Sequence, residues 1–331
     1  MINSYSKWWS TVIALLTLLC CQDRTVKLSA DDIKNAIVYV AYSTQKIKNY
    51  NVSSKEIYII PVEDNAKPLR ITYNDNWEEQ PVWLGSGNFI VFMRCAGRVG
   101  SPNSKWYLFS KNLYTSKEER IIEISMGVKV KASENVYILF YSEPNPALYN
   151  LEEQKKIIKK KFTSEELGIT ITGPGSGLWN FDVNKKVDKI LVCFTDGARV
   201  EGSKLVEIDK FMELAIVNID GTNFQVLTND TFPDFAPAIS PDGKFIAFES
   251  VRERNRDIYI MEIESRKLTR LTEHPADDYS PTWSPDGKRV AFISDRDGHS
   301  HIYVINADGT GLFQLTKGEF EVWPGISWSP R

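Results

Sequence analysis

Short apolar runs alternate with tight-turn signals along the C-terminal half of the chain, and the pattern repeats. The sequence Ser-Pro-Asp-Gly-Lys at 240–244 occurs again forty-four positions later, at 284–288. Because Asp-Gly supplies the backbone freedom that a two-residue hairpin needs, the second copy predicts a turn between a strand at Pro281–Trp283 and another at Arg289–Ile293. The second strand is almost continuously apolar, which is typical of a strand buried on both faces. A repeat of this length with short strands and tight turns predicts the blades of a β-propeller.

Fainter copies of the repeat lie upstream. Trp83–Phe92 aligns with Trp283–Phe292 without a gap, and a copy that begins near Lys131 has lost its tryptophan. Trp179 opens the next copy, and on this alignment Cys193 takes the place of Ala291 as a small buried residue. Five repeats are therefore expected to start near the following residues: Trp83, Lys131, Trp179, Ile239 and Trp283.

The two ends of the chain supply the missing blade. Residues 326–330 read as a first strand with no second strand after it, whereas Ile37–Tyr42, Ile57–Ile60 and Leu69–Thr72 read as later strands that lack a first. Pairing these ends would remove exposed sheet edges. We therefore expect an all-β fold, a six-bladed β-propeller of four-stranded antiparallel blades, closed by pairing of strand 326–330 with the N-terminal blade.

The repeats cover residues 37–331 as a single domain, with insertions at 143–178 and 195–212 that read as surface loops. A seventh blade would have to lie within these insertions. The repeated Trp-Ser-Pro-Asp-Gly-Lys text at 283–288 resembles the WD40-like (PD40) repeats of TolB-like propellers from bacterial envelopes. The resemblance is close over 214–316 and degenerate over 37–200. It implies a rigid protein-binding propeller in the cell envelope.

The family comparison also sets expectations about domains outside the propeller. TolB carries an additional α/β domain before its propeller, and the sequence before residue 37 is too short for one, so the role of TolB cannot simply be transferred. The same repeat caps prolyl-oligopeptidase-type peptidases. The repeats leave no residues to build the hydrolase domain of those enzymes.

The first 21 residues read as a leader. Lys7 precedes the uncharged apolar stretch Thr11–Leu19, and Cys20 and Cys21 follow. This arrangement resembles a bacterial lipoprotein signal, with Cys21 as the lipidated residue because Cys20 is then the small residue before cleavage. Cys20 is the alternative lipidation site, and residues 22–36 are a tether. An ordinary secreted protein or a retained anchor are the other interpretations; the lipoprotein would be periplasmic or associated with the outer membrane.

The charge of the chain limits the classes of molecule that it is expected to bind. The net charge is −3, which argues against nucleic acid. Lysines at 155–161 are read as a solvated edge strand rather than a binding patch. A monomeric body is expected, held at the membrane by its N-terminal lipid and contacting envelope proteins.

Candidate catalytic chemistry is sparse. The chain has 3 histidines, which limits acid–base and metal chemistry. A serine-hydrolase elbow needs the motif Gly-x-Ser-x-Gly. The nearest sequence, at 173–177, has Pro174 two places before the serine and is better interpreted as a loop. Four residues beside one hairpin form a weak candidate for a metal site: Asp295, Asp297, His299 and His301. The simpler interpretation of this segment is a hairpin loop without a metal. We expect no catalytic residue and no cofactor.

The strongest binding candidate comes from the repeat itself. An acid lies five residues before the first-strand marker in three blades: Glu78, Asp234 and Asp278. In a propeller these acids would meet at one mouth of the channel, as a negative rim for a basic peptide, a cation or a glycan. Alternatively, each caps a turn within its own blade. Three aromatic residues near the same rim would anchor a partner: Trp77, Tyr279 and Trp323.

Three function classes follow. The first is a non-catalytic envelope scaffold for protein–protein interaction. The second is a carbohydrate-binding or cation-binding propeller. The third is a propeller hydrolase or lyase, which the scarcity of histidine disfavours.

Overall fold

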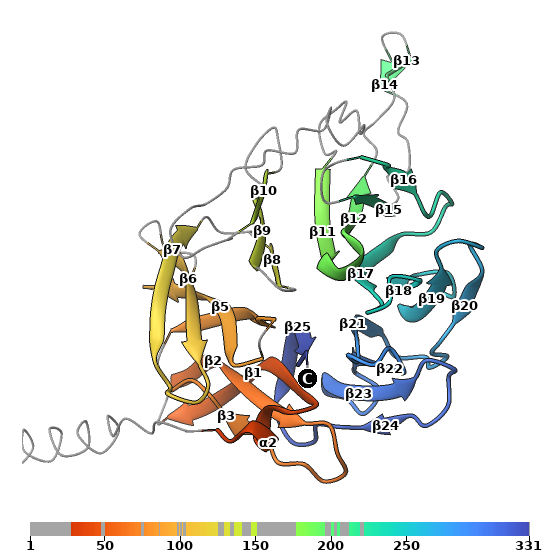
Figure 1. The fold of residues 1–331 in the computed structure, drawn as a ribbon. Coiled ribbons are helices and arrows are strands. Elements are labelled where there is room, and N and C mark those ends of the chain that lie inside the picture. Colours follow the sequence, from red (N-terminus) through yellow and green to blue (C-terminus); the bar gives the residue numbers. More distant parts are fainter. Residues whose placement is uncertain are drawn as a thin grey trace, which may run out of the picture.

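The computed structural model describes residues 28–330 with several gaps: 48–49, 74–75, 86, 98, 100, 102–103, 125–128, 133–135, 141–146, 151–176, 196–199, 202–203, 206–211 and 219–221. The described part is built from antiparallel sheets arranged around a common centre (Figure 1). In this part of the chain, none of the helices has the length and hydrophobicity needed to span a membrane.

Two C-terminal sheets are regular four-stranded meanders. One consists of β17 (Asp234–Ile239), β18 (Phe245–Ser250), β19 (Asp257–Glu262) and β20 (Leu268–Arg270). The other consists of β21 (Asp278–Trp283), β22 (Arg289–Ser294), β23 (His301–Asn306) and β24 (Phe313–Gln314).

The Asp-Gly hairpins form as predicted. Gly287 has φ +69°, in the left-handed region that favours glycine. Asp286 accepts hydrogen bonds from the Ser284 hydroxyl at 2.6 Å and from the Lys288 N–H at 3.1 Å. The aspartate therefore stabilises the turn locally, while glycine supplies the backbone conformation.

The sheets formed by the middle part of the sequence, which we call the central sheets, are less regular. One contains β11 (Gly177–Asn184), β12 (Lys189–Thr195), β15 (Met212–Asn218) and β16 (Gln225–Val226), with the 3-10 helix η1 (Lys185–Val187) between its first two strands. Another contains β8 (Lys129–Ala132), β9 (Val136–Phe140) and β10 (Ala147–Asn150). A short hairpin, β13 (Val200–Glu201) and β14 (Lys204–Leu205), lies in the predicted 195–212 insertion.

The predicted 143–178 insertion is not all loop, because β10 pairs with β9. Most of that insertion, including the lysines at 155–161, lies outside the described residues.

The two ends of the chain share one sheet. Its strands are β25 (Glu321–Trp328), β1 (Ala36–Ile47), β2 (Tyr50–Pro61), β3 (Leu69–Arg70), β4 (Trp77–Trp83), β5 (Phe89–Ala96), β6 (Lys105–Asn112) and β7 (Glu118–Ile124). β25 pairs antiparallel with β1, which places residues from the two ends of the chain in adjacent strands as predicted.

Within this sheet, β2 and β4 share one parallel bridge, Lys55 to Trp77. β25 begins five residues before the predicted start, because Glu321 and Val322 already pair with β1.

Part of the predicted tether packs against the body. The helix α2 (Ala30–Ile33) is capped by Ser29, and Leu28 and Ile33 are buried with β1 and β2. This differs from a free tether over 22–36, because these two apolar side chains gain burial against the first sheet.

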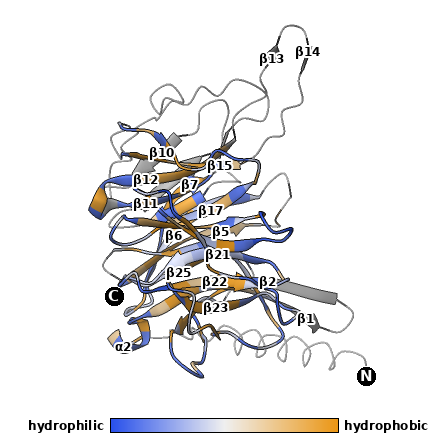
Figure 2. Cartoon of the chain, turned by 90° about the vertical axis from the view of Figure 1, so that its right-hand side faces the viewer, coloured by the Kyte–Doolittle hydropathy of each residue, from blue (hydrophilic) through white to orange (hydrophobic). Residues whose placement is uncertain are grey.

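Sheet faces are buried on both sides. Val290 and Phe292 pack toward β18 and β19, whereas Ala291 and Ile293 pack toward β1 and β25. Alternate residues of one strand thus face two different sheets, which explains its continuous apolar sequence. Figure 2, a view from the side, shows hydrophobic residues along the stacked strands.

The alignment of the central repeat was wrong by four residues. Trp283 pairs with Val290, and the equivalent pair in the central sheet is Val183 with Ile190. Val183, not Trp179, therefore takes the marker position. By the same register Leu191, not Cys193, matches Ala291. The error arose because η1 replaces the Asp-Gly turn in this repeat. The sequence therefore contains no turn motif from which the register of the two strands could be predicted.

We expect loss of the Trp328 side chain to destabilise the protein strongly. Trp328 is 6% exposed, lies in the core between β1 and β22, and donates its indole N–H to Asn35 at 3.1 Å. Trp328→Ala should cost about 3–5 kcal/mol in urea unfolding. Leu312→Ala, at a 44% exposed side chain, should stay within about 0.5 kcal/mol. Equal unfolding midpoints for the two variants would contradict the burial of β25.

Candidate functional site

The innermost strands carry a repeated bulge. Two residues after the predicted acid position, φ is positive at Gln80 (50°), Ala236 (41°) and Ser280 (53°), and Gly325 on β25 has φ 106°. The pairing register shifts beside each of the first three residues. A bulge bends its strand and re-aims the adjoining groups. Here the bulges turn the inner strands around one central cavity.

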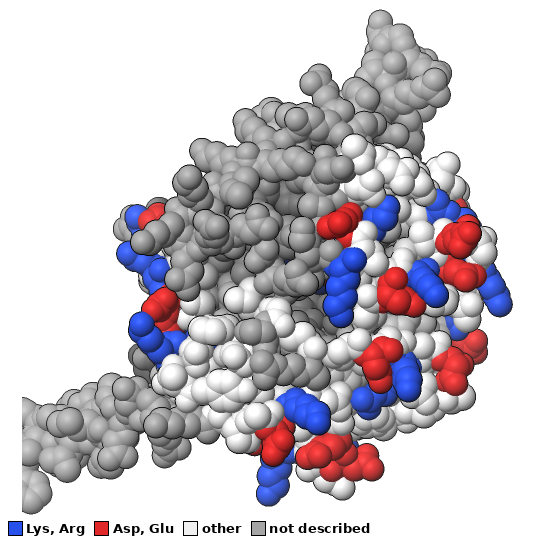
Figure 3. Space-filling view, viewed as in Figure 1, with Lys and Arg blue, Asp and Glu red and all other residues white. Residues whose placement is uncertain are grey.

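The cavity has a volume of about 90 Å³ and is lined by residues of β4, β8, β11, β17, β21 and β25. Strands far apart in the sequence therefore meet at this point. Viewed along the same direction as Figure 1, the described surface has a hollow near its middle, with side chains of both charges interspersed around it (Figure 3).

The three predicted acids are buried rather than exposed. Glu78, Asp234 and Asp278 are each 0% exposed. Each pairs with an arginine that follows the second strand or lies in it: Arg94 on Glu78 at 2.5 Å, Arg252 on Asp234 at 2.5 Å, and Arg296 on Asp278 at 2.9 Å. A buried carboxylate needs such a partner because its desolvation is costly. The acids therefore do not form the open negative rim that we expected.

Each of these arginines also lies on aromatic rings of its own sheet. The Arg296 guanidinium is 5.6 Å from the Phe292 ring centre and 4.6 Å from that of Tyr303, and these rings stack on each other. Arg94 and Arg252 make the same kind of contact with aromatic residues of their second and third strands. Arg252 and Arg296 each follow their acid by 18 positions, and Arg94 follows Glu78 by 16, so the sequence contains a repeat signal for these pairs.

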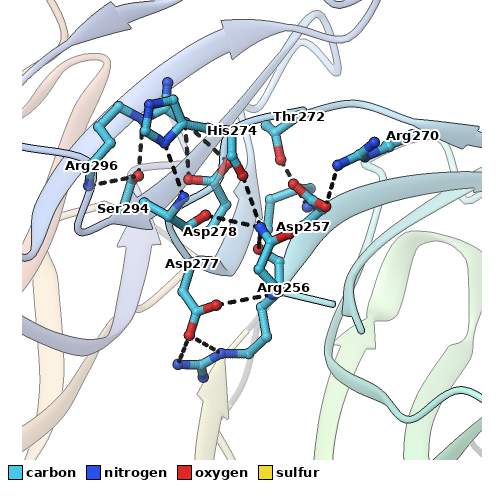
Figure 4. A network of polar contacts seen from close by, with 12 residues as sticks. Arg256, Asp257, Arg270, Thr272, His274, Asp277, Asp278, Ser294 and Arg296 are labelled. Atoms are coloured by element: carbon cyan, nitrogen blue, oxygen red, sulfur yellow. Dashed lines mark hydrogen bonds and ion pairs between the residues drawn. The ribbon is translucent and has the colours of Figure 1, made fainter. Parts of the chain in front are cut away.

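Ion pairs also link neighbouring sheets (Figure 4). Arg256, just before β19, donates to Asp277, just before β21, from its backbone N–H at 3.0 Å and from its guanidinium at 2.9 Å. This pair holds together the segments that lead into β19 and β21. Within the first of these two sheets, Asp257 on β19 pairs with Arg270 on β20 at 2.7 Å.

Lys55 lies in a cluster of charged and aromatic side chains that the sequence analysis did not predict. It is 1% exposed, and its ammonium lies 2.7 Å from Glu79 and over the rings of Trp77 (4.2 Å) and Trp323 (3.2 Å). Burial lowers the pKa of Lys55, while Glu79 opposes this shift. β2, β4 and β25 thus bring two predicted aromatic anchors onto one cation. We call Lys55, Trp77, Glu79 and Trp323 the lysine cage.

The predicted aromatic anchors differ in accessibility. Trp323 is 41% exposed and Trp77 is half-buried. Tyr279 is only 9% exposed, donates its hydroxyl to Ser300 at 2.9 Å, and lies 4.8 Å below the Arg256 guanidinium. Tyr279 is therefore a structural residue of the interface between sheets, and the expectation that it is an exposed anchor was wrong.

The predicted metal residues lie near one another but bind different groups. His299 contacts Glu321 at 2.8 Å, whereas His301 contacts the Gly318 carbonyl at 3.1 Å. His301 also lies 3.8 Å from Asp297, and burial lowers its pKa. Among the described residues, no group of three or more His, Cys, Asp or Glu side chains has the geometry to hold a metal ion. Cys20 and Cys21 lie outside the described residues.

Glu249 is a buried acid that contacts Ser280, one of the residues that line the cavity. It accepts the N–H of Ser280 at 2.7 Å and lies 3.8 Å from Arg256. Burial nevertheless raises the pKa of Glu249 to about 7. Glu56 and Glu213, also buried, have pKa values raised to about 7 for the same reason.

Comparisons with known proteins agree with this geometry. Residues 206–331 match the family model described as PD40, TolB beta propeller domain. The structure is similar to TolB from Acinetobacter baumannii, with TM-score 0.66, 17% identity, and coverage of 91% of this chain and 68% of that one. A putative TolB from Agrobacterium tumefaciens gives TM-score 0.60 and 17% identity, covering 89% and 94%.

The tricorn protease gives TM-score 0.59 and 14% identity over 86% of this chain and 27% of that one. No curated protein matches the sequence. The resemblance to TolB-like propellers that we inferred from the repeated text at 283–288 is thus confirmed. At these identities the structural similarity concerns the fold, not the function.

We expect the Asp278–Arg296 pair to show strong coupling. Arg296→Met leaves the Asp278 carboxylate buried without its partner and should cost about 3–5 kcal/mol. The double variant Asp278→Asn/Arg296→Met leaves no charge and should be more stable than Arg296→Met alone. Lys117→Met, at an exposed surface pair, should change stability by less than about 0.5 kcal/mol. Additive losses in urea unfolding would exclude the coupling.

We expect stability to fall as pH rises because of Glu249. Its pKa is higher in the folded protein than the usual 4.5, so the folded state holds the proton more tightly and is destabilised between about pH 4.5 and 7. Glu249→Gln should raise the melting temperature relative to the unmodified protein at pH 8 and much less at pH 5.

The paired comparison isolates Glu249 from His301, whose lowered pKa acts in the opposite direction. The exposed Glu264→Gln should not alter the pH profile. A Glu249→Gln profile parallel to the unmodified one would refute the assignment.

Proposed function

We propose that this protein is a non-catalytic propeller of the bacterial envelope that docks another envelope protein at the mouth of its central channel. The proposal includes a six-bladed closed ring over residues 37–331, with a monomeric body. The observation that carries it is Trp323, which is large, aromatic and 41% exposed, yet held in place over the buried Lys55. Rigid aromatic residues in such positions are typical anchors of protein interfaces.

The charges around the mouth favour binding over catalysis. Glu78 pairs with Arg94, Asp277 with Arg256, and Glu79 with Lys55. Groups held in close ion pairs stabilise loops and strands, whereas a reacting acid or base must be free to exchange a proton with its substrate. A surface of paired charges with the exposed ring of Trp323 suits a partner that is recognised by shape.

A glycan-binding propeller is the second candidate function. The exposed ring of Trp323 is a flat apolar surface on which a sugar ring could stack. The arginines on Glu78, Asp234 and Asp278 make a cation a less suitable ligand for those acids.

Capture experiments test the docking surface. We expect cross-linking in intact cells, followed by mass spectrometry, to capture one envelope protein with the unmodified chain and at least tenfold less with Trp323→Ala. Leu268→Ala removes a similarly exposed apolar side chain from β20, at 38% exposure, and should capture normally. Equal capture by both variants would refute docking at Trp323; a thermal shift with oligosaccharides instead of any capture would favour the glycan.

The envelope location is part of the proposal, with residues 1–21 as leader and Cys21 as the lipid anchor. We expect radiolabelled palmitate to enter the unmodified protein and Cys20→Ala, since alanine is also a small residue before the cleavage site. Cys21→Ala should take up none. Labelling of Cys21→Ala but not of Cys20→Ala would assign the anchor to Cys20, and labelling of neither unmodified protein nor variants would exclude a lipoprotein.

A further inference from the structure

Two lysines of one strand line the central cavity. Lys129 and Lys131 lie on β8, and residues two apart on a strand point to the same side. Burial lowers the pKa of Lys129, and repulsion by Lys131 adds to this shift. A cavity lined by two neighbouring lysines attracts negative charge.

The two lysines differ in whether a carboxylate lies close to the ammonium group. The Lys131 ammonium lies 3.9 Å from Asp182. Within the described part of the chain, the Lys129 ammonium forms no hydrogen bond and no ion pair within 4.0 Å. Lys129 thus faces the cavity with its charge unmatched by a close carboxylate.

The acids around Lys129 are engaged elsewhere. Glu79 and Glu249 attract Lys129 electrostatically. Glu79, however, makes its close contact with Lys55 at 2.7 Å, and Glu249 accepts the N–H of Ser280 at 2.7 Å. Asp182 accepts the N–H of Ile239 at 2.8 Å. Each nearby carboxylate is therefore held by another group and makes no close ion pair with Lys129.

The size and lining of the cavity limit what can enter. A cavity of about 90 Å³ has room for a few water molecules or for one small oxyanion. The lining also includes the polar residues Ser280 and Asn180 and the apolar residues Pro281, Pro324 and Ile326. Such a mixture of apolar wall and a few polar groups is typical of small-ligand sites.

We propose that the central cavity binds a small oxyanion, a phosphate or a carboxylate group, with Lys129 as its charged partner and Lys131 beside it. This inference does not depend on the proposed docking of an envelope protein. Free phosphate and a carboxylate share the negative oxygen atoms that an ammonium group recognises. They differ in shape, since one is tetrahedral and the other planar.

Calorimetric titration and thermal unfolding of the full chain, with inorganic phosphate and with acetate at constant ionic strength, test the site. We expect at least one of these anions to bind and to raise the melting temperature above that in chloride. Binding of phosphate alone identifies a tetrahedral ligand, and binding of acetate alone a carboxylate. Absence of binding by both anions would overturn the proposal.

Variants locate the site. Lys129→Met should weaken binding at least tenfold, and Lys129→Arg, which keeps the charge, should retain part of it. Lys244→Met removes an exposed hairpin lysine and is the matched control, expected to bind as the unmodified protein does. Circular dichroism of each variant verifies folding, and Lys131→Met, expected to bind more weakly, provides a second test if Lys129→Met does not fold. Unchanged affinity in folded Lys129→Met would refute the assignment.

Discussion

The buried pair of an inner-strand acid and an arginine of the same sheet is the interaction on which the mouth of this propeller depends. Glu78, Asp234 and Asp278 sit at the start of an inner strand, where several sheets converge and water is excluded. A carboxylate in such a place is tolerated only with a close, hydrogen-bonded counter-charge. The arginines meet this need within each sheet, and they pack against two aromatic rings of that sheet at the same time.

This pairing determines what the mouth presents to other molecules. With the acids paired inside, the mouth presents the exposed ring of Trp323, and the cavity contains Lys129. β25 has Trp323 five residues before Trp328, where β21 has Asp278 five residues before Trp283. The sheet that joins the two ends of the chain therefore departs from the repeat, and this departure creates the lysine cage.

The repeat explains why much of the fold was predictable and part of the site was not. The sequences at 240–244 and 284–288 predicted hairpins and buried strands, because turn chemistry and apolar pattern are local properties. The pairing of the chain ends was predicted separately, from the unmatched first strand at 326–330 and the later strands at 37–72. The register failed at Trp179, where η1 replaces the turn text.

The site depends on contacts that no local pattern encodes. Tyr279 packs into a core shared with β1, β22, β23 and β25 and is covered by Arg256 of the preceding sheet. The cage brings Lys55 to Trp323 across 268 positions of sequence. The arginines were visible in the repeat, since Arg252 and Arg296 follow their acids by the same 18 positions. Reading acids and bases together along the repeat would have predicted these pairs.

The most direct measurement of the central claim is the rate at which arginine side-chain N–H groups exchange with solvent, observed by nuclear magnetic resonance. The Nε–H of Arg94 donates to Glu78 at 2.8 Å and that of Arg296 to Ser294 at 2.9 Å, and both guanidinium groups are 13% exposed. The account predicts slow exchange for both, compared with the exposed Arg254. Exchange of Arg94 and Arg296 as fast as that of Arg254 would mean that the acids are not neutralised in this way, and would contradict the account.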